Sequence, residues 1–162
     1  MLRKTVFLGL GSNKGDKKLN IAKTIKFLKI LKKTNLTGMS SLYLSKPVGF
    51  QRQQTFLNSV VRVETFLTPY DLLRELKKIE KKIGRKKNFR NGPRLIDIDI
   101  LIFEGFKIKN IRLEIPHPRL FYRPFVLVPL YEIFTNLEYN IYSYDCMRSS
   151  RFSIFKNLEL LM

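Results

Sequence analysis

The sequence lacks the residues and motifs that build several common kinds of site. Its 162 residues include one cysteine, Cys146, which excludes an internal disulfide and any metal site built from a cysteine cluster. Tryptophan is absent, and His117 is the only histidine. No G-x-x-x-x-G-K-[ST] sequence occurs, so a nucleotide would have to bind without a P-loop. No apolar run approaches the roughly 18 residues that a membrane span requires, so we expect no membrane partner.

Acidic residues are scarce as well. The chain has 13 Asp and Glu against 31 Lys and Arg, for a formal net charge of +18. Such a charge favours anionic partners but does not distinguish nucleic acid, a membrane surface and a nucleotide. Many lysines lie in short runs such as Lys32-Lys33 and Lys77-Lys78, which we interpret as solvated helix faces.

The apolar content indicates a single folded domain. Hydrophobic residues make up 44% of the chain and no linker divides it, so we expect one domain over residues 1–162. The apolar run that follows MLRK is too short for a signal peptide and lacks a small-residue cleavage site. We therefore interpret it as the first strand of a cytoplasmic protein.

Hydrophobic spacing predicts the order of the elements. Strands are expected over residues 5–10, 38–45, 56–66 and 95–103, and helices over residues 17–31, 70–83 and within 121–134. Asp16 is the expected N-cap of the first helix, and Pro69 marks the start of the second. The leading order, β-α-β-β-α-β, predicts an α+β fold of the ferredoxin-like kind, an antiparallel sheet with helices packed on one face. A weakly patterned C-terminal appendage follows.

Three glycines near the N-terminus invite a different interpretation. Gly9, Gly11 and Gly15 have the spacing G-x-G-x-x-x-G, which does not match the dinucleotide-binding pattern. We expect them to form a tight turn between the first strand and the first helix.

The segment GRKKNFRNGPRLIDID, residues 84–99, carries the strongest chemical signal. Residues two apart on a strand point to the same face, so Asp97 and Asp99 should project together. Mg²⁺ is commonly bound by one or two carboxylates plus substrate phosphates. Arg85, Arg90 and Arg94 would supply forked donors for phosphate oxygens. The segment therefore predicts a site for a polyanion, such as a nucleoside triphosphate, bound with a divalent metal.

Other candidate residues lie outside this segment. His117 stands between two prolines and, if placed near phosphate, would donate a hydrogen bond to an anionic oxygen; a purely structural role is the alternative. Phe56, Phe89 and Phe125 are either core residues or, where two face each other, a clamp for a flat heterocycle. Asn58 would read the polar edge of such a ring.

Five segments together give the chain a resemblance to a known family. They are LGSNKGD (10–16), SSLYLSKPVG (40–49), FLNSVV (56–61), GRKKNFRNGPRLIDIDIL (84–101) and IPHPRLFYRPFVLVPL (115–130). In this order they resemble 6-hydroxymethyl-7,8-dihydropterin pyrophosphokinases of folate biosynthesis, over residues 6–134. The resemblance implies transfer of pyrophosphate from ATP to the pterin hydroxymethyl group, with release of AMP. It also implies small-molecule partners rather than nucleic acid, and we expect a monomer.

The resemblance assigns roles to particular residues. It implies that Asp97 and Asp99 hold two Mg²⁺ ions and that Arg85 and Arg94 share in catalysis. The implied ATP-binding residues are Glu80, Arg85, Lys87, Arg90, Arg94, Ile100, Arg112, His117 and Arg123. The implied pterin-binding residues are Ser45, Val48, Phe56, Asn58 and Phe125. The proton acceptor stays open between Asp97 and a metal-bound state of the hydroxyl.

The chain departs from the family pattern at three positions. Asn91 stands where the family usually has Trp, Lys87 where it has a second arginine, and Phe56 where members have Tyr. These changes affect loop closure and affinity more than the reaction. An RNA-binding module is the main alternative, but the K/R-G-F/Y-G/A-F-V-x-F/Y signature is absent. A catalytically inactive homologue is a second alternative, and the intact carboxylate pair argues against it.

Overall fold

The computed structural model describes residues 2–49, 52–86 and 92–134. In chain order the elements are β1 (Lys4–Ser12), α1 (Lys17–Lys29), β2 (Thr34–Met39), β3 (Tyr43–Ser45), β4 (Phe56–Thr65), α2 (Pro69–Ile83), β5 (Asp97–Phe103), β6 (Ile108–Lys109), β7 (Glu114–Ile115), the 3₁₀ turn η1 (Leu120–Tyr122) and α3 (Pro124–Ile133). The predicted appendage after α3 lies outside the described residues.

The main sheet is antiparallel and has β1 near its centre. β1 pairs with β4 on one side and β5 on the other, and β2 pairs with the far edge of β4, which gives the order β2-β4-β1-β5. This order confirms the predicted ferredoxin-like arrangement. The single strand predicted over residues 38–45 is wrong in its middle, because β2 ends at Met39 and β3 pairs separately with the start of β4.

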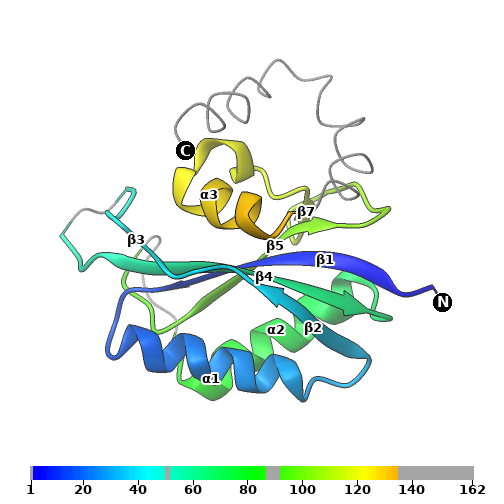
Figure 1. Ribbon diagram of the computed structural model, residues 1–162, viewed down its shortest axis with the longest axis horizontal. Helices are drawn as coiled ribbons and strands as arrows, with labels where there is room; N and C mark the ends of the chain where they lie inside the picture. The colour runs from blue at the N-terminus through cyan, green and yellow to red at the C-terminus, as the bar shows by residue number, and fades with distance from the viewer. Residues whose placement is uncertain (1, 50–51, 87–91, 135–162) are drawn as a thin grey trace.

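Helices cover both faces of this sheet (Figure 1). α1 and α2 lie against one face, and α3 lies against the other, while Ile108, Leu113 and Ile115 of the β6–β7 hairpin pack in the cluster on the α1 and α2 side. Alternation along β1 explains the two layers, since Val6 and Leu8 pack in the cluster beneath α1 and α2 while Phe7 packs in the cluster with α3 residues. The prediction placed helices on one face only and was therefore incomplete, because α3 covers the second face. The cavity of the candidate active site lies on this second face.

The predicted starts of both helices and the predicted end of α2 are confirmed, whereas α1 ends at Lys29, two residues before the predicted end. Asp16 Oδ1 accepts a hydrogen bond from the Leu19 amide at 2.9 Å, and Thr68 caps α2 just before Pro69. Gly84 ends α2 with φ of +102°, a conformation that glycine adopts readily. This turn brings the next residue, Arg85, toward β5, where its side chain reaches Asp97.

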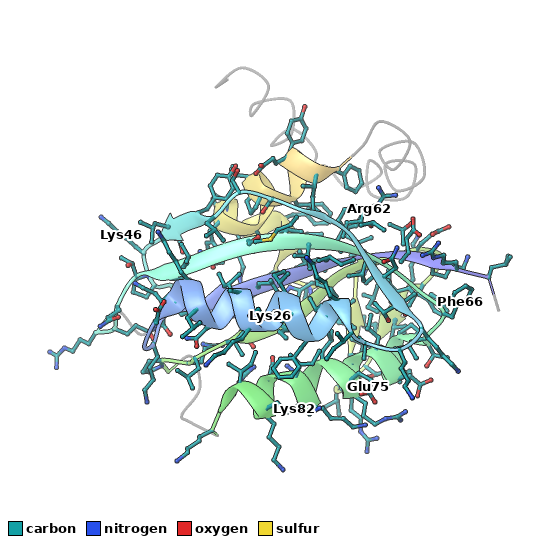
Figure 2. The ribbon with its side chains drawn as sticks, turned by 60° about the horizontal axis from the view of Figure 1, so that its bottom comes forward. Lys26, Lys46, Arg62, Phe66, Glu75 and Lys82 are labelled. Carbon is teal, nitrogen blue, oxygen red and sulfur yellow. The ribbon has the colours of Figure 1, made fainter. Side chains whose placement is uncertain are left out.

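Many of the lysines lie on the helical side of the molecule. Figure 2 shows the side formed by α1 and α2, with Lys26 on α1 and both Glu75 and Lys82 on α2. Lys77 and Lys78 are exposed on α2, as the solvated-face interpretation predicted. Lys32 and Lys33 are also exposed, but they lie in the turn between α1 and β2 and not on a helix. Within the described ranges, no helix is both long and apolar enough to cross a membrane.

Candidate active site

A cavity of about 400 Å³ lies between the sheet and α3. Its lining includes alternate residues of two neighbouring strands, with Gly9 of β1 paired to Asp99 of β5 and Gly11 paired to Asp97. Because glycine has no side chain, a ligand can approach the backbone closely beside each carboxylate. The expectation of a glycine turn was wrong for Gly9 and Gly11, which lie within β1, and only Gly15, with φ of +65°, lies in the turn.

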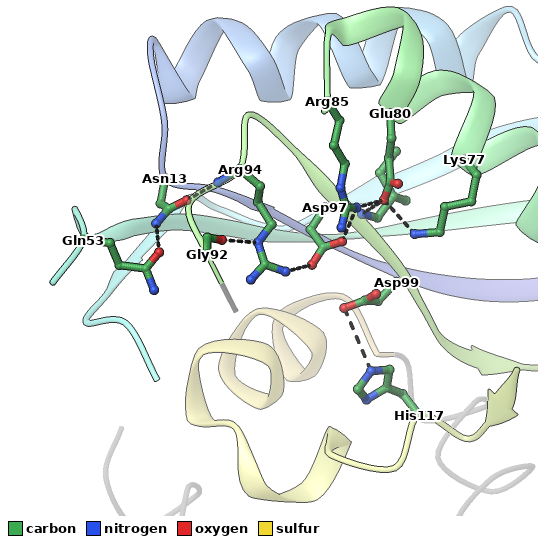
Figure 3. A network of polar contacts seen from close by, with 11 residues as sticks. Asn13, Gln53, Lys77, Glu80, Arg85, Gly92, Arg94, Asp97, Asp99 and His117 are labelled. Carbon is green, nitrogen blue, oxygen red and sulfur yellow. Dashed lines mark hydrogen bonds and ion pairs between the residues drawn. The ribbon is translucent and has the colours of Figure 1, made fainter. Parts of the chain in front are cut away.

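The two carboxylates project from one face of β5, as the alternation predicted, but their surroundings differ. Arg85 Nη1 lies 2.5 Å from Asp97 Oδ1, and Arg94 Nη1 lies 2.6 Å from Asp97 Oδ2 (Figure 3). Burial favours the neutral acid, but the positive charges of Arg85 and Arg94 outweigh it, so the pKa of Asp97 lies below its usual value. Asp97 is therefore an ionised carboxylate with a cation at each oxygen.

Asp99 has a weaker set of partners. Its side chain is 36% exposed, and His117 Nε2 lies 3.9 Å from its Oδ2. Burial and the negative charge of nearby Asp97 raise the pKa of Asp99, although His117 acts in the opposite direction. A carboxylate in this position would gain from a bound cation.

The donor set fits a magnesium ion that is completed by its ligand. Within residues 2–49, 52–86 and 92–134 no group of three or more His, Cys, Asp or Glu side chains is placed to hold a metal. Asp97 and Asp99 would thus supply carboxylate oxygens, and phosphate oxygens and water would complete the coordination. Mg²⁺ is commonly bound in this way.

Glu80 supports Asp97 through Arg85. Its side chain is almost fully buried, and its Oε1 accepts hydrogen bonds from the Ile98 amide at 2.8 Å and from Lys77 Nζ at 2.9 Å. Arg85 Nη1 lies 2.6 Å from the same oxygen, so one guanidinium bridges Glu80 and Asp97 (Figure 3). Burial raises the pKa of Glu80, while Lys77, Ile98 and Arg85 oppose that rise. Glu80 ties α2 to β5 and holds Arg85.

The backbone fixes the orientation of His117. Its amide donates to the Leu101 carbonyl at 2.8 Å, and its Nδ1 accepts from the Arg119 amide at 3.1 Å. Because Nδ1 is an acceptor, the proton of the neutral ring belongs on Nε2, the nitrogen that faces Asp99. Burial lowers the pKa of His117, and the charges of Arg123 and Arg119 add to this effect against the opposing pull of Asp99. His117 thus presents a neutral N–H donor to the cavity.

All five residues assigned to pterin binding line the same cavity, namely Ser45, Val48, Phe56, Asn58 and Phe125. Asn58 Nδ2 donates to Ser45 Oγ at 2.9 Å, which orients the amide. The Arg94 guanidinium carbon lies 5.8 Å from the centre of the Phe56 ring, and that of Arg123 lies 5.7 Å from the Phe125 ring. Each ring thus lies beside an arginine, and both arginines lie toward the part of the cavity that holds Asp97 and Asp99.

Some residues assigned to ATP binding lie elsewhere. Arg112 is exposed in the turn between β6 and β7, and it is not part of the cavity lining. The Ile100 side chain packs in the core beneath α1 and α2, so only its backbone faces away from that core. Lys87 and Arg90, like Phe89 and Asn91, lie outside the described residues. Their ATP contacts stay predictions.

Sequence reasoning missed two residues that hold parts of the site in place. Asn13 Oδ1 accepts from the Arg94 amide at 2.8 Å, and its Nδ2 donates to Gln53 Oε1 at 2.8 Å, so it links the loops that lead into α1, β4 and β5 (Figure 3). Arg119 lines the cavity and orients His117. Both lie within segments that carried the resemblance, and the contacts that assign their roles form only in the folded chain.

Paired carboxylates, arginines and a ring-lined pocket in one cavity define a site suited to metal-assisted transfer of a phosphorylated group. Most of the chain also matches one protein family. The model of the family described as 7,8-dihydro-6-hydroxymethylpterin-pyrophosphokinase matches residues 7–135. The chain belongs to this family.

Individual relatives agree with the family assignment. Proteins named 2-amino-4-hydroxy-6-hydroxymethyldihydropteridine pyrophosphokinase are similar to the chain: that of Aquifex aeolicus is 45% identical over 138 residues (85% of each protein), and that of Bacillus subtilis is 39% identical over 132 residues (82% of this chain and 79% of the relative). The domain also occurs in longer proteins, since a Pisum sativum folate synthesis bifunctional protein is 43% identical over 79% of this chain but only 25% of its own length.

A solved structure shows the same fold. The wild-type HPPK-DHPS of Plasmodium falciparum with pteroate aligns with a TM-score of 0.63 at 19% identity, over 81% of this chain and 39% of that one. This likeness confirms the predicted fold class.

Proposed function

We propose that the protein transfers pyrophosphate from ATP to the hydroxymethyl group of 6-hydroxymethyl-7,8-dihydropterin, releasing AMP, in folate biosynthesis. Membership of the pyrophosphokinase family supports this reaction. The observation that carries it within the structure is the shared cavity, in which Asp97 and Asp99 stand beside Phe56, Asn58 and Phe125. Both substrates would therefore meet in one enclosed space.

The pterin would bind at the end of the cavity where the aromatic residues gather. Phe56 and Phe125 offer apolar ring faces, and the Asn58 amide oxygen offers an acceptor to a heterocycle edge, because its Nδ2 already donates to Ser45 Oγ and to the Tyr43 carbonyl. Ser45 Oγ takes a hydrogen bond from Asn58 Nδ2, which leaves the amide oxygen oriented for the ligand. The pterin hydroxymethyl group would then point toward the carboxylates.

The triphosphate would lie over β5 and the start of α3. Arg94 and Arg123 line this part of the cavity, and His117 directs Nε2–H toward it. Charge-assisted hydrogen bonds from these groups would offset charge that develops during transfer. Arg85 would act from behind Asp97 and hold its carboxylate in place. These residues bring nucleophile and phosphorus together, which is the main contribution that enzymes make to phosphoryl transfer.

Asp97 and Asp99 would hold two Mg²⁺ ions, which, when bound, would neutralise phosphate charge and lower the pKa of the attacking hydroxyl. Asp97 is also a candidate to take up the hydroxyl proton. We further propose that the enzyme acts as a monomer. A cytoplasmic location stays a prediction.

The test is the formation of AMP from ATP by purified full-length protein at saturating Mg²⁺. We expect AMP only when 6-hydroxymethyl-7,8-dihydropterin is present, together with the pyrophosphorylated pterin in equal amount. No AMP from well-folded protein would reject the enzyme assignment. Tight, salt-sensitive RNA binding in that case would favour the RNA-binding alternative.

A further inference from the structure

The edge strand of the sheet breaks beside the cavity. At the break, the Ser40 amide donates to the Val60 carbonyl, but the Val60 amide donates to Ser40 Oγ instead of a backbone carbonyl, at 2.9 Å. The side chain of Ser40 thus takes the place of a ladder acceptor. The next amide, that of Ser41, then needs a partner outside the ladder, because unpaired backbone groups are costly.

Glu132 on α3 supplies that partner. Its two carboxylate oxygens accept from the Ser41 amide at 3.0 and 2.9 Å, from Ser41 Oγ at 2.8 Å and from the Tyr43 hydroxyl at 2.8 Å. Burial would raise the pKa of Glu132, but the hydrogen bonds from Ser41 and Tyr43 outweigh this and lower it. One ionised side chain therefore joins the last turn of α3 to the residues between β2 and β3.

These two segments continue into residues that line the pterin end of the cavity, Ser45 after Tyr43 and Phe125 on α3. On the strand side, the Tyr43 carbonyl accepts from Asn58 Nδ2 at 3.4 Å, and the same amide group donates to Ser45 Oγ at 2.9 Å. On the helix side, Phe125 lies seven residues before Glu132, about two helical turns away and so on the same side of α3. Glu132 therefore connects the segment that holds the Asn58 amide to the helix that carries Phe125.

We propose that Glu132 is a positioning residue for the pterin: its carboxylate holds Ser41 and Tyr43 against α3 and so sets the width of the pocket between Asn58 and Phe125. This inference rests on the proposed pyrophosphokinase activity. Glu132 touches neither substrate and acts through Tyr43 and Phe125. The carboxylate half of the site, on β5, does not depend on it.

A role confined to stability would give a different result. Loss of a structural contact alone would lower the melting temperature or the fraction of active protein, so that kcat falls and the two KM values stay the same. Loss of pocket positioning raises KM for one substrate. The comparison of the two KM values therefore separates these roles.

The experiment measures steady-state kinetics for both substrates with Glu132→Ala, Glu132→Gln, Tyr43→Phe and the double variant Glu132→Ala/Tyr43→Phe. We expect Glu132→Ala to raise KM for the pterin about fivefold, in the range for residues that share a hydrogen-bond network, with kcat and KM for ATP little changed. Glu132→Gln should recover most of the loss, since its amide oxygen still accepts from Ser41. The double variant should resemble Glu132→Ala, because both changes remove the same link.

Glu75→Ala is the matched control. Glu75 lies on α2, on the other face of the sheet, and forms ion pairs with Arg74 and Lys78 of its own helix. It should leave both KM values unchanged. An unchanged pterin KM in Glu132→Ala, an equal rise in both KM values, or additive effects of Glu132→Ala and Tyr43→Phe would overturn the inference. A wild-type protein without pterin-dependent AMP formation would overturn the proposed function as well.

Discussion

Gly11 lies directly opposite Asp97 in the pairing of β1 with β5. Gly9 stands opposite Asp99 in the same register, so each carboxylate of the candidate metal site has a glycine beside it on the neighbouring strand. β1 therefore presents bare backbone to the cavity at these two positions. A ligand held by Asp97 and Asp99 can rest against β1 without meeting a side chain.

Substitution of Gly11 tests whether this bare backbone matters. A Cβ at Gly11 would meet Asn58 Oδ1 at 3.5 Å and Phe56 Cδ1 at 3.9 Å, both ordinary contacts, so Gly11→Ala should fold normally. Its methyl group would occupy space between the pterin residues and Asp97, and we expect the pterin KM to rise about tenfold. Gly38→Ala on β2 is the control, because its Cβ would meet only Arg62 Cβ at 3.5 Å. Equal kinetics for both variants would contradict this role.

The Asp99→Asn variant should lose activity but gain thermal stability. The carboxylate of Asp99 ionises less readily in the folded chain than in the unfolded chain, because its pKa is raised by burial and by Asp97. Its charge therefore destabilises the fold at pH 8, and its removal should raise the melting temperature in the absence of ligands. Turnover should fall at least about a thousandfold, corresponding to about 4 kcal/mol of transition-state stabilisation by a bound metal.

Asp97→Asn is the counterpart of that variant. It should also abolish turnover, but it should lower the melting temperature, because Arg85 and Arg94 lose their charged partner. Differential scanning fluorimetry and an AMP assay on both proteins provide the measurements. Retained turnover in both variants would reject the assignment of Asp97 and Asp99 as metal ligands.

Glu80 should contribute mainly to stability. Glu80→Ala would leave the Ile98 amide without its acceptor and Arg85 without one of its two carboxylates. We expect a loss of about 3–5 kcal/mol in the free energy of unfolding, measured by urea denaturation, as for other broken buried ion pairs. Glu80→Gln should lose less, because its amide oxygen can still accept from Ile98. The more exposed Glu75→Ala should cost less than about 1 kcal/mol, and equal losses at the two sites would contradict the prediction.

His117 offers a direct measurement of pKa, since it is the only histidine in the sequence. Its pKa is lowered by burial and by Arg123 and Arg119, so its NMR titration should have a midpoint below 6.5. The folded state binds this proton less readily than the unfolded state. Stability from neutral His117 is therefore present above pH 6.5 and is lost as the pH falls through the folded pKa. Asp99→Asn should lower the midpoint further, and a midpoint at or above 6.5 would contradict this environment.

Local sequence signals predicted much of the fold. The N-cap Asp16 and the first-turn residue Pro69 marked helix starts that the structure confirms, because these effects act within one turn of chain. The break at residues 40–42 was not predictable in the same way. It depends on Ser40 Oγ meeting the Val60 amide and on Glu132 meeting Ser41, which are contacts between distant parts of the sequence.

The sequence by itself determined which chemistry was available. Alternation along residues 95–103 was enough to place Asp97 and Asp99 on one face of a strand, because side-chain direction on a strand is a local property. Only the tertiary structure decided what surrounds them. Strand pairing put glycines beside both carboxylates, and the packing of α2 gave Asp97, through Arg85, a link to the buried Glu80. Packing of α3 on the second face enclosed the cavity, because only there do apolar residues of α3 find the partners on β1, β4 and β5 that bury them.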